Sequence, residues 1–161
     1  MLQAVKSKQA RAAGTNIAIV ASNYNGRYVD AMLKAARREL KKAGAKVQVV
    51  RVPGAFEIPA VAAALAAEAQ STKHATRFSA IICLGVIFQG QTSHAQHIGW
   101  GITHALAAIQ VQQRLPVIHG VFVFGKEEHA RVRCLGRTHN RGAEAAHTAL
   151  EMARVMRSLR D

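Results

Sequence analysis

Short runs of apolar and β-branched residues alternate with longer segments of helical periodicity along this chain, and that alternation limits the folds open to it. The strand-like runs are Asn16–Ala21, Lys46–Val52, Ala80–Val86 and Pro116–Phe124, the last interrupted by Gly120. Strands that are separated by helices usually pair in parallel, and both faces of a parallel sheet need to be covered. We therefore predict an α/β fold, a three-layer α/β/α sandwich around a four-stranded parallel sheet.

The segments between these runs carry apolar residues at the three- and four-residue spacing of helices. Four long helices are predicted over Tyr28–Ala43, Ile58–Ala69, His94–Gln112 and Gly142–Leu159, and a short one over Lys126–Leu135. The polar stretch Gln70–Arg77 is expected to be a loop. Residues 15–161 fit a single domain, and the basic segment 1–14, which lacks the apolar centre of a secretory signal, is expected to be a disordered tail.

The composition favours a soluble protein of a reducing compartment. Half of the 161 residues are hydrophobic, 5% are aromatic, and no apolar run is long enough to span a bilayer. The two cysteines, Cys83 and Cys134, provide neither a disulfide framework nor a zinc ligand set. We expect two unpaired thiols and a cytoplasmic location, with no membrane partner.

A formal net charge of +13 would attract polyanions. The basic residues cluster on the first predicted helix, after the fourth strand and near the C-terminus: Lys34, Arg37, Arg38, Lys41, Lys42, Arg131, Arg133, Arg137, Arg141, Arg154, Arg157 and Arg160. No aromatic residues are interleaved with them to stack on bases, and no nucleic-acid-binding motif is present. A solvated basic surface is therefore favoured, and nucleic acid is expected only as a nonspecific polyanion.

Polar loops follow each of the first three predicted strands, and the third loop contains a glycine and leads to a histidine. The loop sequences are SNYN (Ser22–Asn25), PGAFE (Pro53–Glu57) and GVIFQGQTSH (Gly85–His94). Ligands of parallel sheets bind beyond the carboxyl ends of the strands, so we predict one site assembled from these loops. Backbone amides near Gly90 could bind an anion beside the imidazole of His94. The nucleotide motifs GxGxxG and GxxxxGKS are absent.

A histidine at the start of a helix has a plainer interpretation, because such residues are more often solvated than catalytic. His97 and His104 fall on much the same helix face as His94, which leaves a metal site as an alternative. Neither a carboxylate nor a cysteine accompanies them nearby, so no metal is predicted.

Four separated motifs closely resemble the lumazine synthase family. They are the Asn-Tyr-Asn loop, VPGAFEIP (Val52–Pro59), GVIFQGQTSH and NRGAEAAHTALEMA (Asn140–Ala153), in the same order and spacing as in the family. The resemblance covers the chain apart from the N-terminal tail and implies a flavodoxin-like fold. It also implies the penultimate step of riboflavin biosynthesis: 5-amino-6-(D-ribitylamino)uracil condenses with 3,4-dihydroxy-2-butanone 4-phosphate, phosphate and water are released, and neither metal nor cofactor is needed.

The resemblance implies a set of residues that bind the ribitylaminouracil substrate. Tyr24 would stack on the pyrimidine with Asn25 beside it, and Glu57 would bind the ribityl hydroxyls with the backbone of its neighbours. The full set is Tyr24, Asn25, Ala55, Phe56, Glu57, Val86 and Ile87. Taken alone, Tyr24 could be a half-buried loop residue, Glu57 an acid at a helix N-terminus, and Val86 and Ile87 core residues.

The phosphate half of the site is also implied by the resemblance. Gly90, Gln91 and Thr92 match the phosphate loop, and His94 matches the general acid–base. Arg133 matches a phosphate-binding catalytic arginine, and Arg141 stands where lysine is usual. In the family these two arginines and the residue at position 119, here His119, come from a neighbouring subunit of a pentamer. The sequence leaves open a pentamer, a stacked pair of pentamers or an icosahedral shell of twelve.

Three residues depart from the family pattern. Gln89 replaces a common arginine, Gln96 replaces an acid two residues after His94, and His119 replaces a pocket-closing aromatic. Together with the charge of +13, these departures support a second hypothesis. In it, the chain forms a basic oligomeric cage or interaction protein that holds polyanionic cargo, with weak or lost catalysis.

Overall fold

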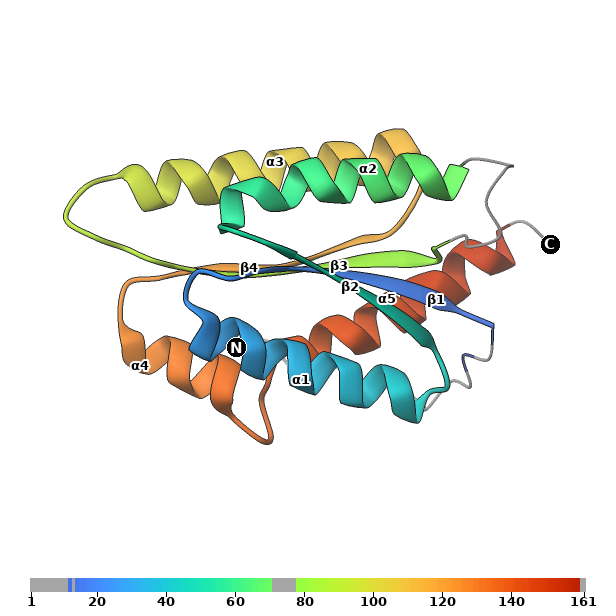
Figure 1. Ribbon diagram of the computed structural model, residues 1–161, viewed down its shortest axis with the longest axis horizontal. Helices are drawn as coiled ribbons and strands as arrows, with labels where there is room; N and C mark the ends of the chain where they lie inside the picture. The colour runs from blue at the N-terminus through green and yellow to red at the C-terminus, as the bar shows by residue number, and fades with distance from the viewer. Residues whose placement is uncertain (1–11, 13, 71–77, 160–161) are drawn as a thin grey trace.

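The computed structural model describes residues 12, 14–70 and 78–159 (Figure 1). The predicted tail 1–14 falls almost entirely outside the described residues, as does the predicted loop Gln70–Arg77 apart from Gln70, which ends a helix. None of the helices in these described ranges is long and apolar enough to cross a membrane.

A four-stranded parallel sheet runs through the middle of the molecule. Its strands are β1 (Asn16–Ser22), β2 (Lys46–Val52), β3 (Ala80–Phe88) and β4 (Val117–Phe124). They lie in the order β2-β1-β3-β4, and every neighbouring pair is parallel. The predicted sheet is confirmed, and its two edges are β2 and β4.

The prediction that Gly120 interrupts the fourth strand is wrong. β4 is continuous, and Gly120 pairs with Leu84 of β3 in the parallel register. A Cβ atom at this position would lie 2.6 Å from the carbonyl oxygen of Cys83 and 2.8 Å from a methyl carbon of Leu84. The glycine therefore permits a close approach between neighbouring strands, which is a common reason for glycine inside a strand.

Helices cover both faces of the sheet. They are α1 (Gly26–Lys42), the short 3₁₀ turn η1 (Ala55–Glu57), α2 (Ile58–Gln70), α3 (His94–Gln113), α4 (Glu127–Ala130), the π-helical turn η2 (Arg131–Leu135) and α5 (Arg141–Ser158). Figure 1 shows α2 and α3 on one face and α1, α4 and α5 on the other. The predicted three-layer α/β/α sandwich is confirmed.

Each face of the sheet has its own hydrophobic core. Alternate residues of β1 point to opposite faces, so that Ile17 and Ile19 pack with α1 and α5, whereas Ala18 and Val20 pack with α2 and α3. The central strands β1 and β3 are buried on both faces, which explains their nearly continuous apolar sequences. β2, at an edge, alternates between exposed and partly buried residues along most of its length.

The start of α5 presses against the middle of α1. A Cβ atom on Gly142 would lie 1.9 Å from the carbonyl oxygen of Met32, so only glycine fits between the two backbones. Gly142 is itself buried. This contact fixes the N-terminal end of α5 relative to the rest of the α1 layer.

Candidate active site

Two hydrogen bonds connect the polar loops after β1 and β2 with each other and with the end of β3. The backbone N–H of Tyr24 donates to the carbonyl of Pro53 at 3.0 Å, which connects the first loop to the second. The side-chain amide of Asn25 donates to the carbonyl of Val86 at 2.7 Å, which connects the first loop to the end of β3. Because all strand pairs are parallel, the loops after β1, β2 and β3 leave the sheet at the same end of the strands, toward the left in Figure 1.

Tyr24 and Asn25 have very different environments. The side chain of Tyr24 is 74% exposed, so the residue is not the half-buried loop aromatic of the plainer interpretation. Asn25 adopts the left-handed conformation, with φ of 57° and ψ of 37°, directly before α1. Asparagine tolerates this conformation better than most residues. One face of the Tyr24 ring is therefore open to a planar ligand, while Asn25 fixes the backbone beneath it.

Glu57 closes the turn that follows β2. Its Oε2 atom accepts a hydrogen bond from the N–H of Gly54 at 2.9 Å, at the start of η1. Glu57 thus does act as an acid at a helix N-terminus. The side chain is also exposed, and a carboxylate has about four lone-pair positions, so it keeps capacity for ligand hydroxyls. Of its neighbours, Ala55 is buried and Phe56 is 63% exposed.

At the end of β3, the side chains of Val86 and Ile87 pack in the two cores, and the backbone of Val86 contacts the first loop. Val86 is 2% exposed and its side chain belongs to the core on the α1 face, while its carbonyl accepts from Asn25. Ile87 is partly buried and packs toward the opposite core. The side chain of Val86 is therefore a core residue, so only the backbone of Val86 could contact a ligand.

Gln89 holds the loop Gly90–Thr92 in shape. Its side-chain amide donates to the carbonyl of Thr92 at 2.6 Å, and its backbone N–H donates to the carbonyl of Phe124 at 2.9 Å. Gly90, Gln91 and Thr92 are exposed, and space is open around Gly90. In the sequence, Gln89 stands out only as a replaced arginine, and no pattern indicates that its amide reaches across its own loop.

His94 is the first residue of α3 and is exposed. Its backbone N–H lies 3.4 Å from the hydroxyl oxygen of Thr92, which connects the start of α3 to the loop that precedes it. Further along α3, the Nδ1 atom of His104 lies 2.8 Å from the carbonyl oxygen of Trp100. Within the described residues, no group of three or more histidine, cysteine, aspartate or glutamate side chains is placed to hold a metal ion.

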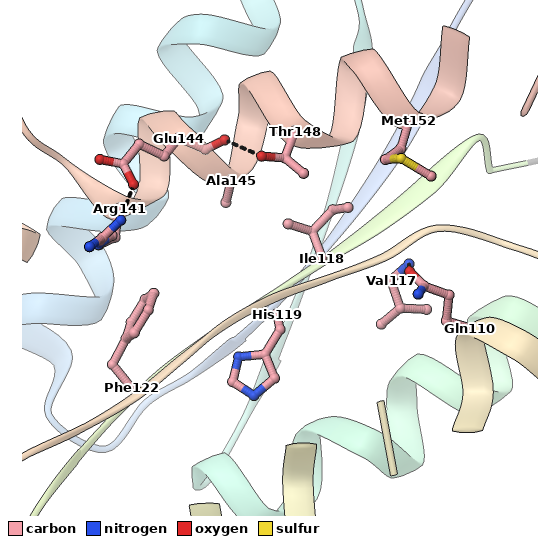
Figure 2. A pocket seen from close by; sticks show the side chains of 10 residues that line it. All are labelled: Gln110, Val117, Ile118, His119, Phe122, Arg141, Glu144, Ala145, Thr148 and Met152. Atoms are coloured by element: carbon pink, nitrogen blue, oxygen red, sulfur yellow. Dashed lines mark hydrogen bonds and ion pairs between the residues drawn. The ribbon is translucent and has the colours of Figure 1, made fainter. Parts of the chain in front are cut away.

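His119 and Arg141 lie in a different place, along the free edge of β4. There a cavity of about 430 Å³ opens between α3, β4 and α5 (Figure 2). The Nε2 atom of His119 lies 2.9 Å from the hydroxyl oxygen of Thr103, and that hydroxyl also donates to the carbonyl of Gly99. Desolvation by the surrounding protein lowers the pKa of His119 below its usual value, so the neutral ring is favoured.

Arg141 is oriented by two neighbours on the rim of the same cavity. Its guanidinium forms an ion pair with Glu144, one turn further along α5, and lies 5.9 Å from the centre of the Phe122 ring (Figure 2). Phe122 was not among the predicted site residues. An aromatic residue within a strand usually belongs to the core, and its sequence context gave no other signal.

Arg133 lies on the π-helical turn η2 and is exposed. One guanidinium nitrogen lies 3.5 Å from the carbonyl oxygen of His129 in the preceding turn. π-helical turns are rare and often occur at functional sites. The candidate residues thus fall into a loop group, with Tyr24 and His94, and an edge group, with His119 and Arg141, while Arg133 stands on η2.

Both cysteines are buried and unpaired, as the sequence predicted. Burial raises the pKa of Cys83 to about 12 and that of Cys134 to about 11, so neither thiol ionises near neutral pH. Neither is therefore a candidate nucleophile.

A second, basic hollow lies between α1 and β2. The groove has a volume of about 630 Å³ and is lined by Asp30, Leu33, Lys34, Arg37, Arg38, Lys41, Ala45 and Val47. The acidic residue of this lining, Asp30, already forms an ion pair with Arg51, with 2.8 Å between the guanidinium nitrogen and the carboxylate oxygen. The predicted clustering of bases on the first helix is confirmed and forms one surface, which we call the basic groove.

Comparison with known proteins identifies the family. Residues 14–157 match the family described as 6,7-dimethyl-8-ribityllumazine synthase. A protein of that name from Xylella fastidiosa is 40% identical over 92% of this chain and 94% of its own length. Another, from Stenotrophomonas maltophilia, is 37% identical over 88% of this chain and 89% of its own length. This chain, with its parallel sheet and the polar loops at the carboxyl ends of its strands, belongs to the 6,7-dimethyl-8-ribityllumazine synthase family.

Proposed function

We propose that this protein is a transferase that condenses 5-amino-6-(D-ribitylamino)uracil with 3,4-dihydroxy-2-butanone 4-phosphate. The products are 6,7-dimethyl-8-ribityllumazine, phosphate and water. The observation that carries the proposal is the pair of hydrogen bonds that connects the loop after β1 to the loop after β2 and to the end of β3. In a parallel sheet these bonds hold an exposed aromatic ring and a carboxylate at the strand ends from which the glycine-bearing loop also leaves, and the family name adds the reaction.

The chemistry makes modest demands on the protein. An amine attacks a ketone to form an imine with loss of water, phosphate leaves, and the ring closes. Much of the acceleration can come from holding the two substrates in reacting orientation. The remaining demands are a proton-transfer group and cationic or N–H donors for the leaving phosphate.

The loop group supplies binding and proton transfer in this proposal. Tyr24 stacks on the pyrimidine, and Glu57 accepts hydrogen bonds from the ribityl hydroxyls. Gly90, Gln91 and Thr92 donate to the phosphate. The imidazole of His94, at the start of α3 directly after this loop, moves protons during imine formation and phosphate departure.

The edge group and Arg133 complete the site of an adjacent subunit. His119 and Arg141 line a cavity on the free edge of β4, where a second copy of the chain can dock. We propose a homopentamer with sites between subunits, in which Arg133 binds the phosphate held by the loops of the neighbour, and His119 and Arg141 contact the substrates bound there. Pentamers, stacked pentamers and an icosahedral shell all preserve this contact, and we place the assembly in the cytoplasm.

A steady-state assay with both substrates tests the reaction. The wild-type protein should form the lumazine, and His94→Ala should lower kcat by about two to four orders of magnitude, the usual contribution of general acid–base catalysis. His104→Ala is the matched control, because His104 lies on the same helix and is also exposed. Absence of wild-type turnover, or equal activity of His94→Ala and the wild type, would reject the enzyme proposal.

Light scattering coupled to size-exclusion chromatography tests the assembly. A mass of five chains, or a multiple of five, is the expected result. A monomer that retains full activity would contradict the intersubunit site. Mixing inactive His94→Ala with inactive Arg133→Ala chains is a sharper measurement, because mixed pentamers should regain part of the activity at interfaces that contain both intact halves.

The basic groove supports a second, nonspecific role in binding polyanions. Lys34, Arg37 and Lys41 line it from successive turns of α1. Replacing these three residues with alanine should weaken binding to a short nucleic acid and reduce the slope of log affinity against log salt concentration. Arg154→Ala is the control, because Arg154 is paired with Glu151 on α5. Binding that is unchanged in the triple variant would place the polyanion elsewhere.

A further inference from the structure

We propose that Asn140 is a positioning residue that holds the helical turn of Arg133 in a fixed relation to the start of α5, so that the Arg133 guanidinium meets the phosphate. The proposal deepens the proposed function and rests on it. Asn140 is 7% exposed, which makes it one of the few buried polar side chains in the described part of the chain. It does not reach the ligand in this proposal and acts only through Arg133.

Both ends of the Asn140 amide are used. Its Nδ2 atom donates to the carbonyl of Cys134 at 2.6 Å, and its Oδ1 atom accepts from the N–H of Gly142 at 2.9 Å. The first bond reaches back across six residues to η2, and the second caps the N-terminus of α5. One buried side chain therefore connects the two helical turns that carry the arginines.

The attachment points are immediate neighbours of the arginines in the chain. Arg133 directly precedes Cys134, and Arg141 directly follows Asn140. The side chain of Arg133 is exposed, and its contact with His129 is long, at 3.5 Å. Because few side-chain contacts orient this guanidinium, its location depends on where the backbone of η2 is held.

The α5 end of this connection is closely packed against α1. Gly142 is pressed against the backbone of Met32, where no Cβ atom would fit. Gly136 is similarly enclosed, since a Cβ atom there would lie 2.6 Å from the carbonyl oxygen of Val132. Asn140 thus attaches η2 to a fixed point in the α1–α5 layer across a tight connection.

Recognition of a phosphate by an arginine requires accurate placement of the guanidinium. An arginine presents its donors in a rigid planar fork, and catalysis is sensitive to displacements of about 1 Å. Glu144 and Phe122 orient Arg141, whereas the placement of Arg133 depends on the bond from Asn140 to Cys134. Loss of the Asn140–Cys134 bond should therefore weaken recognition of the phosphate, while the pyrimidine site, built from other loops, is unaffected.

The test separates the two bonds of Asn140. Asn140→Ser keeps a helix-capping oxygen for Gly142, because serine and asparagine cap about equally well, but its short hydroxyl cannot replace the Nδ2 donor that reaches Cys134. With this variant we expect KM for the butanone phosphate to rise about tenfold, as when a displaced Arg133 loses one hydrogen bond to the phosphate. KM for the pyrimidine should be unchanged, and inhibition by inorganic phosphate should weaken by a similar factor.

Two controls distinguish positioning from a loss of stability. Ala149→Gly, in the buried face of α5, lowers the melting temperature without touching the connection and should leave both KM values unchanged. In an Arg133→Gln background, Asn140→Ser should change KM for the butanone phosphate much less than it does in the wild type. Such non-additivity is expected only if Asn140 acts through Arg133.

The outcomes are separable from those of the proposed function. Equal increases in both KM values, or a change in melting temperature alone, would overturn the positioning role while the enzyme proposal stands. If the wild type has no turnover, the enzyme proposal fails, and calorimetric titration with inorganic phosphate then decides the inference. Weaker binding to Asn140→Ser than to the wild type would support positioning, and equal or absent binding would overturn it.

Discussion

The side-chain amide of Asn25 donates a hydrogen bond to the carbonyl of Val86, 61 residues away in the sequence, at 2.7 Å. Asn25 occupies the left-handed region at the start of α1, and Val86 lies near the carboxyl end of β3. The bond connects the loop that carries Tyr24 to the strand that leads into the loop Gly90–Thr92. One asparagine side chain therefore holds these two segments relative to each other.

Asn25→Ala should destabilise the protein by about 2 kcal/mol. About half of this would come from the alanine Cβ in the left-handed conformation and half from the lost hydrogen bond. Asn25→Gly removes the same bond without the backbone penalty and should cost about 1 kcal/mol less. Urea unfolding monitored by circular dichroism gives both values. Equal losses in the two variants would mean that the left-handed conformation contributes nothing.

Gly142→Ala should be the most damaging alanine substitution at a glycine. Its new methyl group would overlap the carbonyl oxygen of Met32, and relief requires α1 and α5 to separate, at a cost of about 3 kcal/mol or more. Gly125→Ala is the control, because the space around Gly125 is open and its φ is not positive. Thermal unfolding should show a large loss for the first variant and almost none for the second.

His119 should make the protein less stable in mildly acidic solution. Its pKa in the folded state lies below the usual value of 6.5, so the unfolded chain binds more protons as the pH falls below 7. The stability contributed by the neutral ring is complete above pH 7 and decreases as the pH falls through 6.5 toward the folded-state pKa. Melting temperatures measured between pH 7.5 and 5 should fall less for His119→Gln than for the wild type.

That pH window separates His119 from the acidic groups with shifted pKa values. The pKa values of Glu39 and Glu151 are lowered below 4.5, so their contributions are lost only in more acidic solution. Parallel curves for the wild type and His119→Gln between pH 7.5 and 5 would show that the ring is as well solvated as in the unfolded chain.

Glu57→Gln and Glu57→Ala should separate the two interactions of this carboxylate. The glutamine keeps an oxygen for the N–H of Gly54, so its stability should stay within about 0.5 kcal/mol of the wild type. The loss of charge should still raise KM for the pyrimidine about tenfold or more, because hydrogen bonds to a charged group are the stronger ones. Glu57→Ala should lose both the hydrogen bond to the N–H of Gly54 and the interaction with the ribityl hydroxyls. Unchanged KM in both variants would leave Glu57 with a capping role only.

Much of the fold could be predicted from periodicity. No end of a strand or long helix differs from its predicted bound by more than two residues, because buried parallel strands and amphipathic helices leave strong patterns. The misinterpretation of Gly120 has a physical reason. In sequence, a strand glycine that allows close approach to a neighbouring strand looks the same as one that breaks the strand, and only the distance to Cys83 distinguishes them.

The site was predictable to the extent that it depends on strand ends and motif spacing. Tyr24, Glu57 and His94 follow strands, and topology brings their loops to one edge. The contacts of Gln89, Phe122 and Asn140 were not predictable, because each depends on where a side chain points after the fold has formed. Asn140 gave a partial signal, since an asparagine directly before a helix is a common cap, but its second bond leaves no trace in the sequence.

The direction in which the Arg133 side chain points depends on the number of residues in the π-helical turn Arg131–Leu135. A π turn holds one residue more than an α-helical turn, and each residue of an α-helix rotates the side-chain direction by about 100°. Deleting a single residue upstream of Arg133 in this turn would leave the composition almost intact and still point the guanidinium away from its present side. Apart from Arg133 and the buried Cys134, this short segment should therefore accept substitutions more readily than changes of length.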